Sequence, residues 1–255
     1  RELITYFPKI YQAVLASATL DSDVDNLSGL VLHNPLVLKI KEPKLPSAMQ
    51  LTHYHIKAEE FDKAAILYTL LKLSLIKGKI LIFVNTVDKC YKLKLFLEQF
   101  KIPTCVLNSE LPAKVRCHSV AQFNHGLYDI IIASDEGHLM HDPESDNNSK
   151  RKKDKESGVS RGIDFQFVSN VINFDFPYNV NAYIHRAGRT ARGNNKGNVL
   201  SFVSRNEMKM MNSVQEFLRE QHDNATIIKD YNMKMEEIEG FRYRAQDAWK
   251  AVTRF

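Results

Sequence analysis

Short apolar runs rich in β-branched residues, separated by helical patterns, constrain the fold of this chain most strongly. Such runs predict strands that are buried on both faces of a sheet. Between them, apolar side chains recur every three or four positions, which predicts amphipathic helices. The alternation predicts an α/β fold, a doubly wound parallel sheet with helices on both faces and functional loops at the carboxyl ends of its strands. The predicted strands are 79–84, 104–107, 128–133, 168–174 and 198–203, and the predicted helices include 59–76, 87–100 and 113–123.

The composition allows one large domain or one domain with appendages, because the 255 residues are 44% hydrophobic and 25% charged. A formal net charge of +5 makes a polyanionic partner more plausible without establishing one. The cysteines (Cys90, Cys105 and Cys117) show no C-x-x-C spacing, which disfavours a disulfide framework or a zinc site and favours a reducing compartment. No run approaches the ~18 apolar residues that a membrane span needs, so we expect no membrane contact.

One segment interrupts the alternation of strands and helices. Residues 135–158 hold a polar, acidic stretch followed by Lys150-Arg151-Lys152-Lys153, and they have almost nothing to bury. We therefore expect a disordered insertion over 136–158. Its basic run could contact RNA or act as a nuclear address, but most charge runs are simply solvated.

Three arginines recur at every third position in the segment 183–193, YIHRAGRTARG. On a helical turn and the loop after it, Arg186, Arg189 and Arg192 are expected to project their guanidinium groups to a common side. Like charges on one side repel one another, so such a cluster is tolerated mainly where an anion lies opposite it. A triphosphate is a suitable anion, because it accepts the bidentate hydrogen bonds that guanidinium groups donate. The alternative interpretation is a solvated basic helix end.

This segment resembles motif VI, H-R-x-G-R-x-x-R, of the DEAD-box ATP-dependent RNA helicases. The resemblance implies their C-terminal RecA-like domain, a sheet of the P-loop NTPase type. It implies that Arg189 and Arg192 bind the γ-phosphate of ATP as arginine fingers. It also implies that His185 acts in catalysis by coupling the motif to the facing domain, and that Arg186 takes part in interdomain coupling.

A second segment resembles motif V of the same family, but the motif is split by the insertion. Ser134 and Asp135 end a predicted strand, and the pattern resumes as VSRGID over 159–164. The resemblance implies that Ser134 binds an RNA phosphate, that Arg161 and Gly162 lie at the interdomain seam with Gly162 near ATP, and that Asp164 binds the ribose hydroxyls. Ser134 and Asp164 would then form one lip. The family has threonine where this chain has Ser134, and a serine hydroxyl can still donate to phosphate.

Two further segments carry residues that the resemblance assigns to RNA. The stretch IFVNT over 82–86 is similar to motif IV, which places Thr86 along the RNA backbone, although Thr86 is equally suited to cap the next helix. The stretch 108–116 corresponds to H-G-x-x-x-Q-x-x-R, and only Arg116 matches it. Since Asn108 stands where the family has histidine, we expect a weaker or altered grip on RNA there. Asp175, in the V-I-N-Y-D-L-P-like stretch 171–177, is assigned a structural role in the turn before motif VI.

The two ends of the chain extend the resemblance. SAT over 17–19 looks like motif III, with Ser17 and Thr19 in interdomain coupling, after a predicted strand at 11–16 and before a predicted helix at 21–32. At the other end, arginines alternate with Phe241 and Tyr243 before a helix with Trp249, a pattern that suits either base stacking or packing against the parent domain. The stretch 236–244 is similar to the C-terminal extension of nucleolar DEAD-box helicases of large ribosomal subunit assembly.

The expected organisation is therefore a terminal segment of a first helicase domain (1–41), a C-terminal RecA-like domain (42–230) and a helical extension (231–255). The chain starts without Met and contains neither a G-x-x-x-x-G-K-[ST] loop nor a D-E-A-D box, so we expect a piece of a longer protein that is inactive alone. ATP and Mg²⁺ would be held mainly by the first domain. The expected partners are pre-ribosomal RNA and proteins of the pre-ribosomal particle, in the nucleus and nucleolus. The alternatives are a non-catalytic RNA-binding scaffold in such a particle and a DNA-directed helicase.

Overall fold

The computed structural model describes residues 8, 11–15, 22–32, 34–38, 45–47, 49–134, 164–221, 228–233 and 235–253. The chain divides into two compact units, Arg1–Glu42 and Pro43–Phe255. In the first unit, α1 (Ser22–Val31) lies within the predicted helix 21–32. The predicted strand at 11–16 is not formed in its described part, 11–15.

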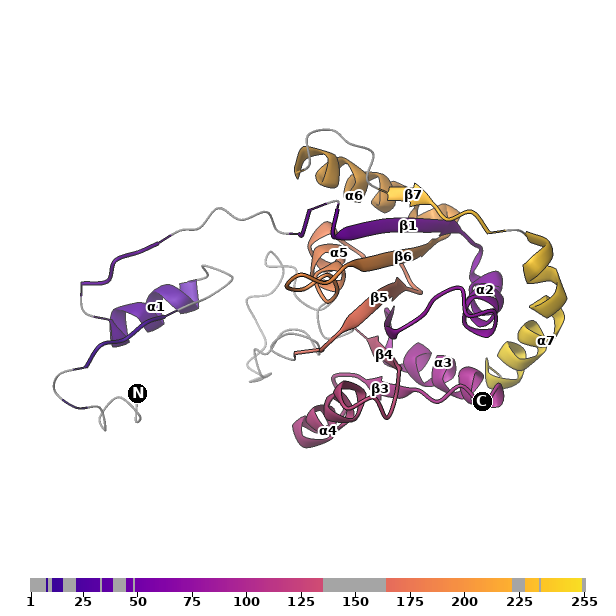
Figure 1. Ribbon diagram of the computed structural model, residues 1–255, viewed down its shortest axis with the longest axis horizontal. Helices are drawn as coiled ribbons and strands as arrows, with labels where there is room; N and C mark the ends of the chain where they lie inside the picture. Colours follow the sequence, from indigo (N-terminus) through magenta and orange to yellow (C-terminus); the bar gives the residue numbers. More distant parts are fainter. Residues whose placement is uncertain are drawn as a thin grey trace, which may run out of the picture. The chain divides into compact units, whose positions relative to one another are not determined.

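The second unit is built on one seven-stranded sheet, in which every pair of neighbouring strands is parallel (Figure 1). The order across the sheet is β3-β4-β2-β5-β6-β1-β7. The prediction of a doubly wound parallel sheet is thereby confirmed. The strands are β1 (Leu51–Lys57), β2 (Lys79–Val84), β3 (Cys105–Leu107), β4 (Ile130–Ser134), β5 (Val168–Asn173), β6 (Gly197–Val203) and β7 (Ile228–Asp230).

Helices cover both faces of the sheet (Figure 1). On one face, α2 (Glu60–Lys72), α3 (Val87–Gln99) and α7 (Met235–Thr253) contribute Leu67, Leu93 and Ile238 to a single apolar cluster. On the other face, α4 (Ala113–Asn124), α5 (Val180–Ala187) and α6 (Met208–Gln221) bury Phe123, Tyr183 and Val214 in a second cluster. The central strands are buried on both sides, which explains their uninterrupted apolar runs.

The C-terminal helix α7 is an integral layer of the domain. It begins at Met235, so Phe241 and Tyr243, which were predicted to precede the helix, belong to it. The helix packs against α2 and α3. The ring of Trp249 lies 5.5 Å from that of Phe96, and Phe241 meets the ring of Tyr68 edge-on at 5.7 Å. The packing interpretation of these aromatic residues is therefore confirmed, although Tyr243 stays 79% exposed.

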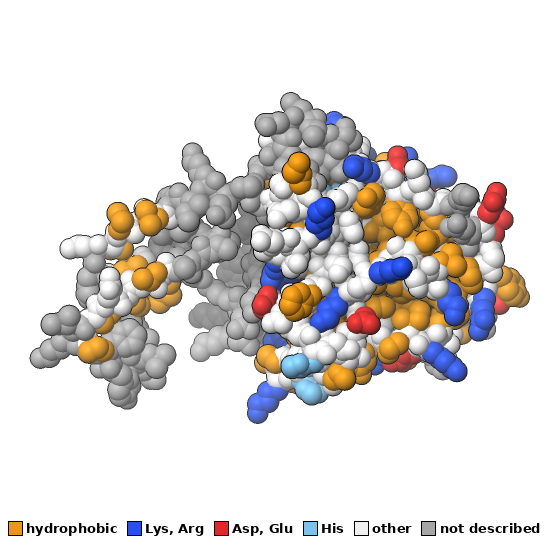
Figure 2. Space-filling view, in the orientation of Figure 1, with side chains coloured by type: hydrophobic (Ala, Val, Ile, Leu, Met, Phe, Trp, Pro, Cys, Tyr) orange, Lys and Arg blue, Asp and Glu red, His pale blue; other side chains and the backbone are white. Residues whose placement is uncertain are grey.

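One face of the molecule shows how its charged side chains are distributed. On the face shown in Figure 2, Lys and Arg side chains are scattered among apolar ones and do not gather in one patch.

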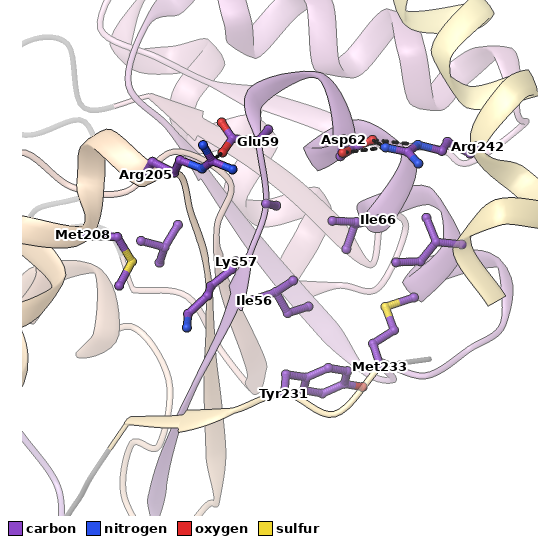
Figure 3. Close-up of a pocket in the computed structure, with 13 residues that line it drawn as sticks. Ile56, Lys57, Glu59, Asp62, Ile66, Arg205, Met208, Tyr231, Met233 and Arg242 are labelled. Atoms are coloured by element: carbon purple, nitrogen blue, oxygen red, sulfur yellow. Dashed lines mark hydrogen bonds and ion pairs between the residues drawn. The ribbon is translucent and has the colours of Figure 1, made fainter. Parts of the chain in front are cut away.

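A pocket of about 460 Å³ opens at the carboxyl ends of β1 and β6 (Figure 3). Among the described helices, none combines the length and the apolar character that crossing a bilayer requires.

Candidate functional site

The arginine segment lies where α5 ends, against the amino edge of the sheet. The side chain of Asn179 caps α5 by accepting a hydrogen bond of 2.7 Å from the backbone of Ala182. After the helix, the hydroxyl of Thr190 donates to the carbonyl of Val168, the first residue of β5, at 2.6 Å. A side chain at Gly197, the first residue of β6, would place its Cβ 2.2 Å from that same hydroxyl. Only glycine fits there, so the loop is held tightly against the starts of β5 and β6.

Arg192 and Asp164, two of the predicted nucleotide-binding residues, are brought together at this edge. Nη1 of Arg192 lies 2.8 Å from Oδ1 of Asp164, and its Nε donates to the carbonyl of Gly188. Both side chains are exposed, 43% for Arg192 and 73% for Asp164. The carbonyl of Asp164 accepts from the Asn124 side chain at the end of α4. An exposed ion pair of this kind is weak, so either partner can exchange it for a ligand at little cost.

The predicted lip of Ser134 and Asp164 is not formed. Ser134 ends β4 at the carboxyl edge of the sheet, whereas Asp164 precedes β5 at the amino edge. The prediction failed because it placed all functional loops at the carboxyl ends of strands, while the chain crosses from one edge to the other between 134 and 164. His185 is exposed on the last turn of α5, and Arg189 directly after the helix is 9% exposed.

Arg186 does not project to a common side with the other two arginines, and that prediction is wrong for it. The side chain is 2% exposed and runs inward across the ring of Phe83. Its guanidinium group donates to the Asn85 side chain and to the carbonyl of Asp175, each at 2.8 Å. Arg186 belongs to the last turn of α5, whereas Arg192 lies in the loop after it. The side chain of Arg186 thus ties the helix to the carboxyl ends of β2 and β5.

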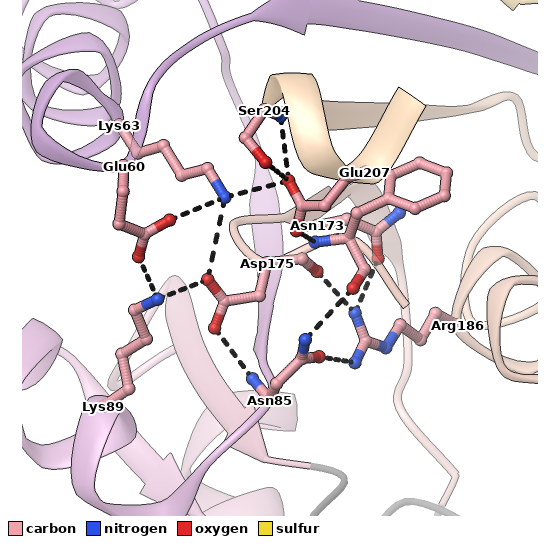
Figure 4. Close-up of polar contacts among 10 residues, drawn as sticks. Glu60, Lys63, Asn85, Lys89, Asn173, Asp175, Arg186, Ser204 and Glu207 are labelled. Carbon is pink, nitrogen blue, oxygen red and sulfur yellow. Dashed lines mark hydrogen bonds and ion pairs between the residues drawn. The ribbon is translucent and has the colours of Figure 1, made fainter. Parts of the chain in front are cut away.

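Arg186 is one end of a buried polar network (Figure 4). The carboxylate of Asp175, 4% exposed, accepts from the backbone of Asn85 at 2.9 Å and from Lys89 at 2.6 Å. Lys63, 1% exposed, lies 3.9 Å from the same carboxylate. The assigned structural role of Asp175 is consistent with these contacts, since it joins the segments after β2 and β5 to two helices.

Two further carboxylates complete the network around Lys63. Glu60 lies 3.0 Å from the ammonium group and also pairs with Lys89, while Glu207 lies 3.3 Å away and accepts from the backbone of Ser204. Burial alone would raise the pKa of Glu60, but the two lysines outweigh it and lower that pKa. Burial would lower the pKa of Lys89, but Asp175 and Glu60 outweigh it and raise that pKa. Glu60 and Lys89 are thus held in their ionised forms by opposite charges.

At the carboxyl edge, three hydrogen-bond donors lack partners among the described residues. They are the hydroxyl of Ser134, Nδ2 of Asn108 and Nε of Arg116. Leu107 of β3 pairs with Ala133 of β4, so Asn108 and Ser134 follow on adjacent strands, and both are 0% exposed. Buried donors without partners are rare in proteins, so we expect these three to meet acceptors that do not belong to the described residues.

Asn108 was not predicted as a binding residue, although it stands at the position where the family motif has a histidine. Its Oδ1 accepts from the backbones of Glu110 and Leu111, which orients the amide and leaves Nδ2 as the unused donor. Thr86, by contrast, is exposed and accepts from the backbone of Lys89 at 3.2 Å. Its interpretation as a helix cap is confirmed, and the cap leaves the hydroxyl proton available for another acceptor.

Some predicted residues lie outside the described part of the chain. These are the motif III residues Ser17 and Thr19, the motif V residues Arg161 and Gly162, and the insertion 136–158.

Comparison with known proteins identifies the family to which this chain is similar. Residues 62–194 match the family model of the helicase conserved C-terminal domain. The chain is 40% identical over 292 residues to the ATP-dependent RNA helicase DBP9 of Candida albicans, covering 99% of this chain and 50% of that protein. It is 39% identical over 299 residues to dbp9 of Schizosaccharomyces pombe, covering 96% of this chain and 50% of that protein. The chain thus spans about half the length of these relatives.

Solved structures share the fold at low sequence identity. Saccharomyces cerevisiae Dbp5 bound to RNA and ADP BeF3 is 22% identical with a TM-score of 0.63, covering 97% of this chain and 57% of that chain. The Escherichia coli DEAD-box protein SrmB bound to RraA is 22% identical with a TM-score of 0.58, covering 74% of this chain and 94% of that chain. The RecA-like fold predicted from the sequence is confirmed.

Proposed function

The chain belongs to the helicase conserved C-terminal domain family, and on this premise we propose that it is the C-terminal half of an ATP-dependent RNA helicase. It grips the RNA backbone and supplies arginine fingers to ATP that a preceding domain holds. The observation that carries this proposal is the division of the candidate residues between two edges of one sheet. Donors without partners lie at the carboxyl edge, and a charged pair that can exchange partners lies at the amino edge.

The amino edge is suited to a nucleotide. In phosphoryl transfer, negative charge builds on the oxygens of the moving phosphoryl group, and a guanidinium group stabilises it. Arg192 can leave the carboxylate of Asp164 for these oxygens, and Asp164 can then accept from the ribose hydroxyls. ATP and Mg²⁺ would be held mainly by the preceding domain, with Gly162, Asp164, Arg189 and Arg192 completing the nucleotide site.

The carboxyl edge is suited to a sugar-phosphate backbone. The hydroxyl of Ser134 and the nitrogens of Asn108 and Arg116 donate only where an acceptor arrives, and phosphate oxygens are strong acceptors. Contacts of this kind carry little base specificity and weaken steeply with salt. The RNA is therefore recognised as a backbone, and Thr86 lies at the same edge of the sheet.

We infer that the two edges are coupled through α5. Its residue Arg186 is bonded at the carboxyl ends of β2 and β5, and the loop after the helix carries Arg189 and Arg192 at the amino edge. We further infer a role in large ribosomal subunit assembly, in the nucleus and nucleolus, with pre-ribosomal RNA and proteins of the pre-ribosomal particle as partners. The resemblance of 236–244 to nucleolar helicases supports this role.

The test replaces Arg192 in the full-length protein. Arg192→Ala should lower kcat of the RNA-stimulated ATPase by about 10³ or more, because an arginine finger is lost, while RNA binding without nucleotide is retained. Arg192→Lys should recover little, since lysine cannot form the bidentate contact. Arg219→Ala, on the exposed face of α6, is the matched control and should be neutral. An unchanged kcat in Arg192→Ala, or RNA binding without any ATPase in the wild type, would favour the scaffold alternative.

A second test separates RNA binding from stability. Ser134→Ala removes a buried hydroxyl that has no partner among the described residues, so the unfolding free energy should stay equal or rise slightly. RNA affinity should fall by roughly three- to tenfold, because a donor to phosphate is lost. A loss of stability with unchanged affinity would show that the hydroxyl serves the fold and not RNA.

A further inference from the structure

A pocket of about 460 Å³ opens where the carboxyl ends of β1 and β6 meet (Figure 3). None of the candidate nucleotide- or RNA-binding residues lines it. Its interior is apolar and comes from four elements: Ile56 of β1, Ile66 of α2, Met208 of α6 and Ile238 of α7. Met233, between β7 and α7, also lines it. Methionine side chains adapt their shape to what they contact, which is typical of surfaces that bind peptide side chains.

The topology of the sheet explains why a pocket opens at this point. β1 leads into α2 on one face, whereas its neighbour β6 leads into α6 on the other face. Adjacent strands whose connections part to opposite faces leave a crevice outside their carboxyl ends, and such switch points are where open α/β sheets bind ligands. This crevice is therefore distinct from the candidate nucleotide and RNA sites.

The charges at the rim indicate what kind of ligand fits. Glu59 pairs with Arg205 at 3.2 Å, and the carboxylate of Asp62 accepts two hydrogen bonds from Arg242, each at 2.9 Å. Both acids are therefore neutralised. Lys57 is exposed and has no carboxylate partner among the described residues, so the rim keeps one positive charge.

We propose that this pocket is a docking site for a short segment of a partner protein, in which a large apolar side chain is flanked by an aspartate or glutamate. Lys57 points to the opposite side of β1 from Ile66 and Met233, so the segment would cross the end of this strand (Figure 3). Its apolar side chain would enter between Ile66 and Met233, and its carboxylate would pair with Lys57. A small polar metabolite fits less well, because the other charged groups at the rim are already bonded to one another. The volume lies within the ~300–1,000 Å³ that is usual for binding pockets.

The pocket shares two chain segments with the buried polar network. In the segment 59–63, Glu59 and Asp62 line the pocket while Glu60 and Lys63 belong to the network. In the segment 204–208, Arg205 and Met208 line the pocket, and Glu207 contacts Lys63. Given the proposed function, a docked segment would therefore act on the support of Arg186 and α5, and so on the ATPase.

The binding test uses a display library of random twelve-residue peptides on the immobilised full-length protein. The wild type should enrich peptides that combine Asp or Glu with a neighbouring Leu, Ile, Met or Phe. A synthetic copy of the most enriched peptide should bind Lys57→Glu and Met233→Glu about tenfold more weakly or worse. Lys229→Glu, an exposed charge reversal on β7 outside the pocket, should bind like the wild type.

Several outcomes would overturn the proposal. They are no enrichment that depends on Lys57, enrichment of basic peptides, and self-association of the protein that Lys57→Glu abolishes, which would make a second copy the occupant. Denaturant midpoints near that of the wild type establish that the variants fold, and Met208→Ser replaces Met233→Glu if the latter does not.

The regulatory arm measures the RNA-stimulated ATPase with saturating peptide. A change of about twofold or more in kcat, absent in Lys57→Glu, is expected. Binding with unchanged kcat would retain the docking site and reject its effect on the arginine helix. Because the binding arms need no ATPase activity, failure of the proposed helicase function would leave them readable.

Discussion

The two edges of the sheet hold their functional residues in opposite ways. At the carboxyl edge, Asn85, Asp175 and Arg186 are almost fully buried and bonded to one another, so the segments that carry them cannot move separately. At the amino edge, Arg192 and Asp164 form a single exposed ion pair above a tightly packed loop. The first arrangement fixes the position of α5, whereas the second leaves the charged groups free to change partners.

This difference fits the chemistry proposed for each edge. A site that grips a backbone repeatedly benefits from a rigid frame, and a site that meets a nucleotide only on domain closure needs groups whose bonds in the open state are weak. The buried network contains three cations and three anions, Lys63, Lys89, Arg186, Glu60, Asp175 and Glu207, so it balances its own charge. Removal of a buried member of this set should therefore cost far more than removal of an exposed residue.

The largest effect is expected from Asp175→Ala. It leaves Lys63 and Lys89 without their shared carboxylate and the backbone of Asn85 without an acceptor, which should lower the unfolding free energy by about 3–5 kcal/mol. Asp164→Ala makes the same chemical change at the amino edge and should cost less than about 1 kcal/mol. Urea unfolding of both variants measures the difference. Equal costs would show that the two edges are held alike.

The next effect concerns the packing of the arginine loop. In Gly197→Ala the new methyl group would lie 2.2 Å from the hydroxyl of Thr190 and 2.7 Å from the backbone nitrogen of Ala191. The loop must move, at a cost of about 1–3 kcal/mol, and the position of Arg192 changes with it. Gly240→Ala is the control, because no atom lies within 4 Å of the added methyl group in α7. Urea unfolding and limited proteolysis should distinguish the two, and a neutral Gly197→Ala would show that the loop is loose.

The sequence predicted the strands with apolar runs well and missed those without them. The predicted strand 79–84 matches β2 at both ends, since it lies in the centre of the sheet with both faces covered. β1 was missed because His53 and His55 interrupt its apolar pattern, although both side chains are buried and paired through Tyr183 and Asp230. β7 is three residues long at the sheet border, too short to produce a pattern.

Prediction of the site had a similar limit. The spacing of the arginines placed Arg186 and Arg192 in one motif. In the structure Arg186 is buried against the carboxyl ends of β2 and β5, whereas Arg192 is exposed and paired with Asp164. Sequence spacing alone does not show which side chain is buried. The partners Lys63 and Glu207 come from distant parts of the chain and have no local signal. The role of Thr86 as a cap was predictable because it depends on its immediate neighbours alone.

A smaller effect is expected from Thr86→Ala, which tests whether the carboxyl edge depends on its cap. The hydroxyl of Thr86 accepts from the backbone of Lys89, and its loss should cost about 1 kcal/mol of unfolding free energy. Thr86→Ser keeps the hydroxyl and should restore most of this stability. In the full-length protein, lower RNA affinity in Thr86→Ala but not in Thr86→Ser would agree with a hydroxyl that serves both helix and RNA. Equal affinity of all three proteins would restrict Thr86 to the cap.

The smallest effect should appear as a dependence on pH, because it comes from the exposed rim of the network. The folded protein lowers the pKa of Glu60 below its ordinary 4.5, so the unfolded chain binds its proton first as the pH falls. The resulting stabilisation is complete above pH 4.5 and is lost as the pH drops through the lowered value. Since the side chain is 56% exposed, the contribution should stay below about 1 kcal/mol.

The difference in unfolding free energy between the wild type and Glu60→Gln should therefore shrink on acidification. It should shrink less when both proteins also carry Lys89→Met, because one cation that lowers the pKa of Glu60 is then missing. A difference that is constant with pH in both backgrounds would place Glu60 outside the balanced charge set, and the network would then depend on its buried members alone.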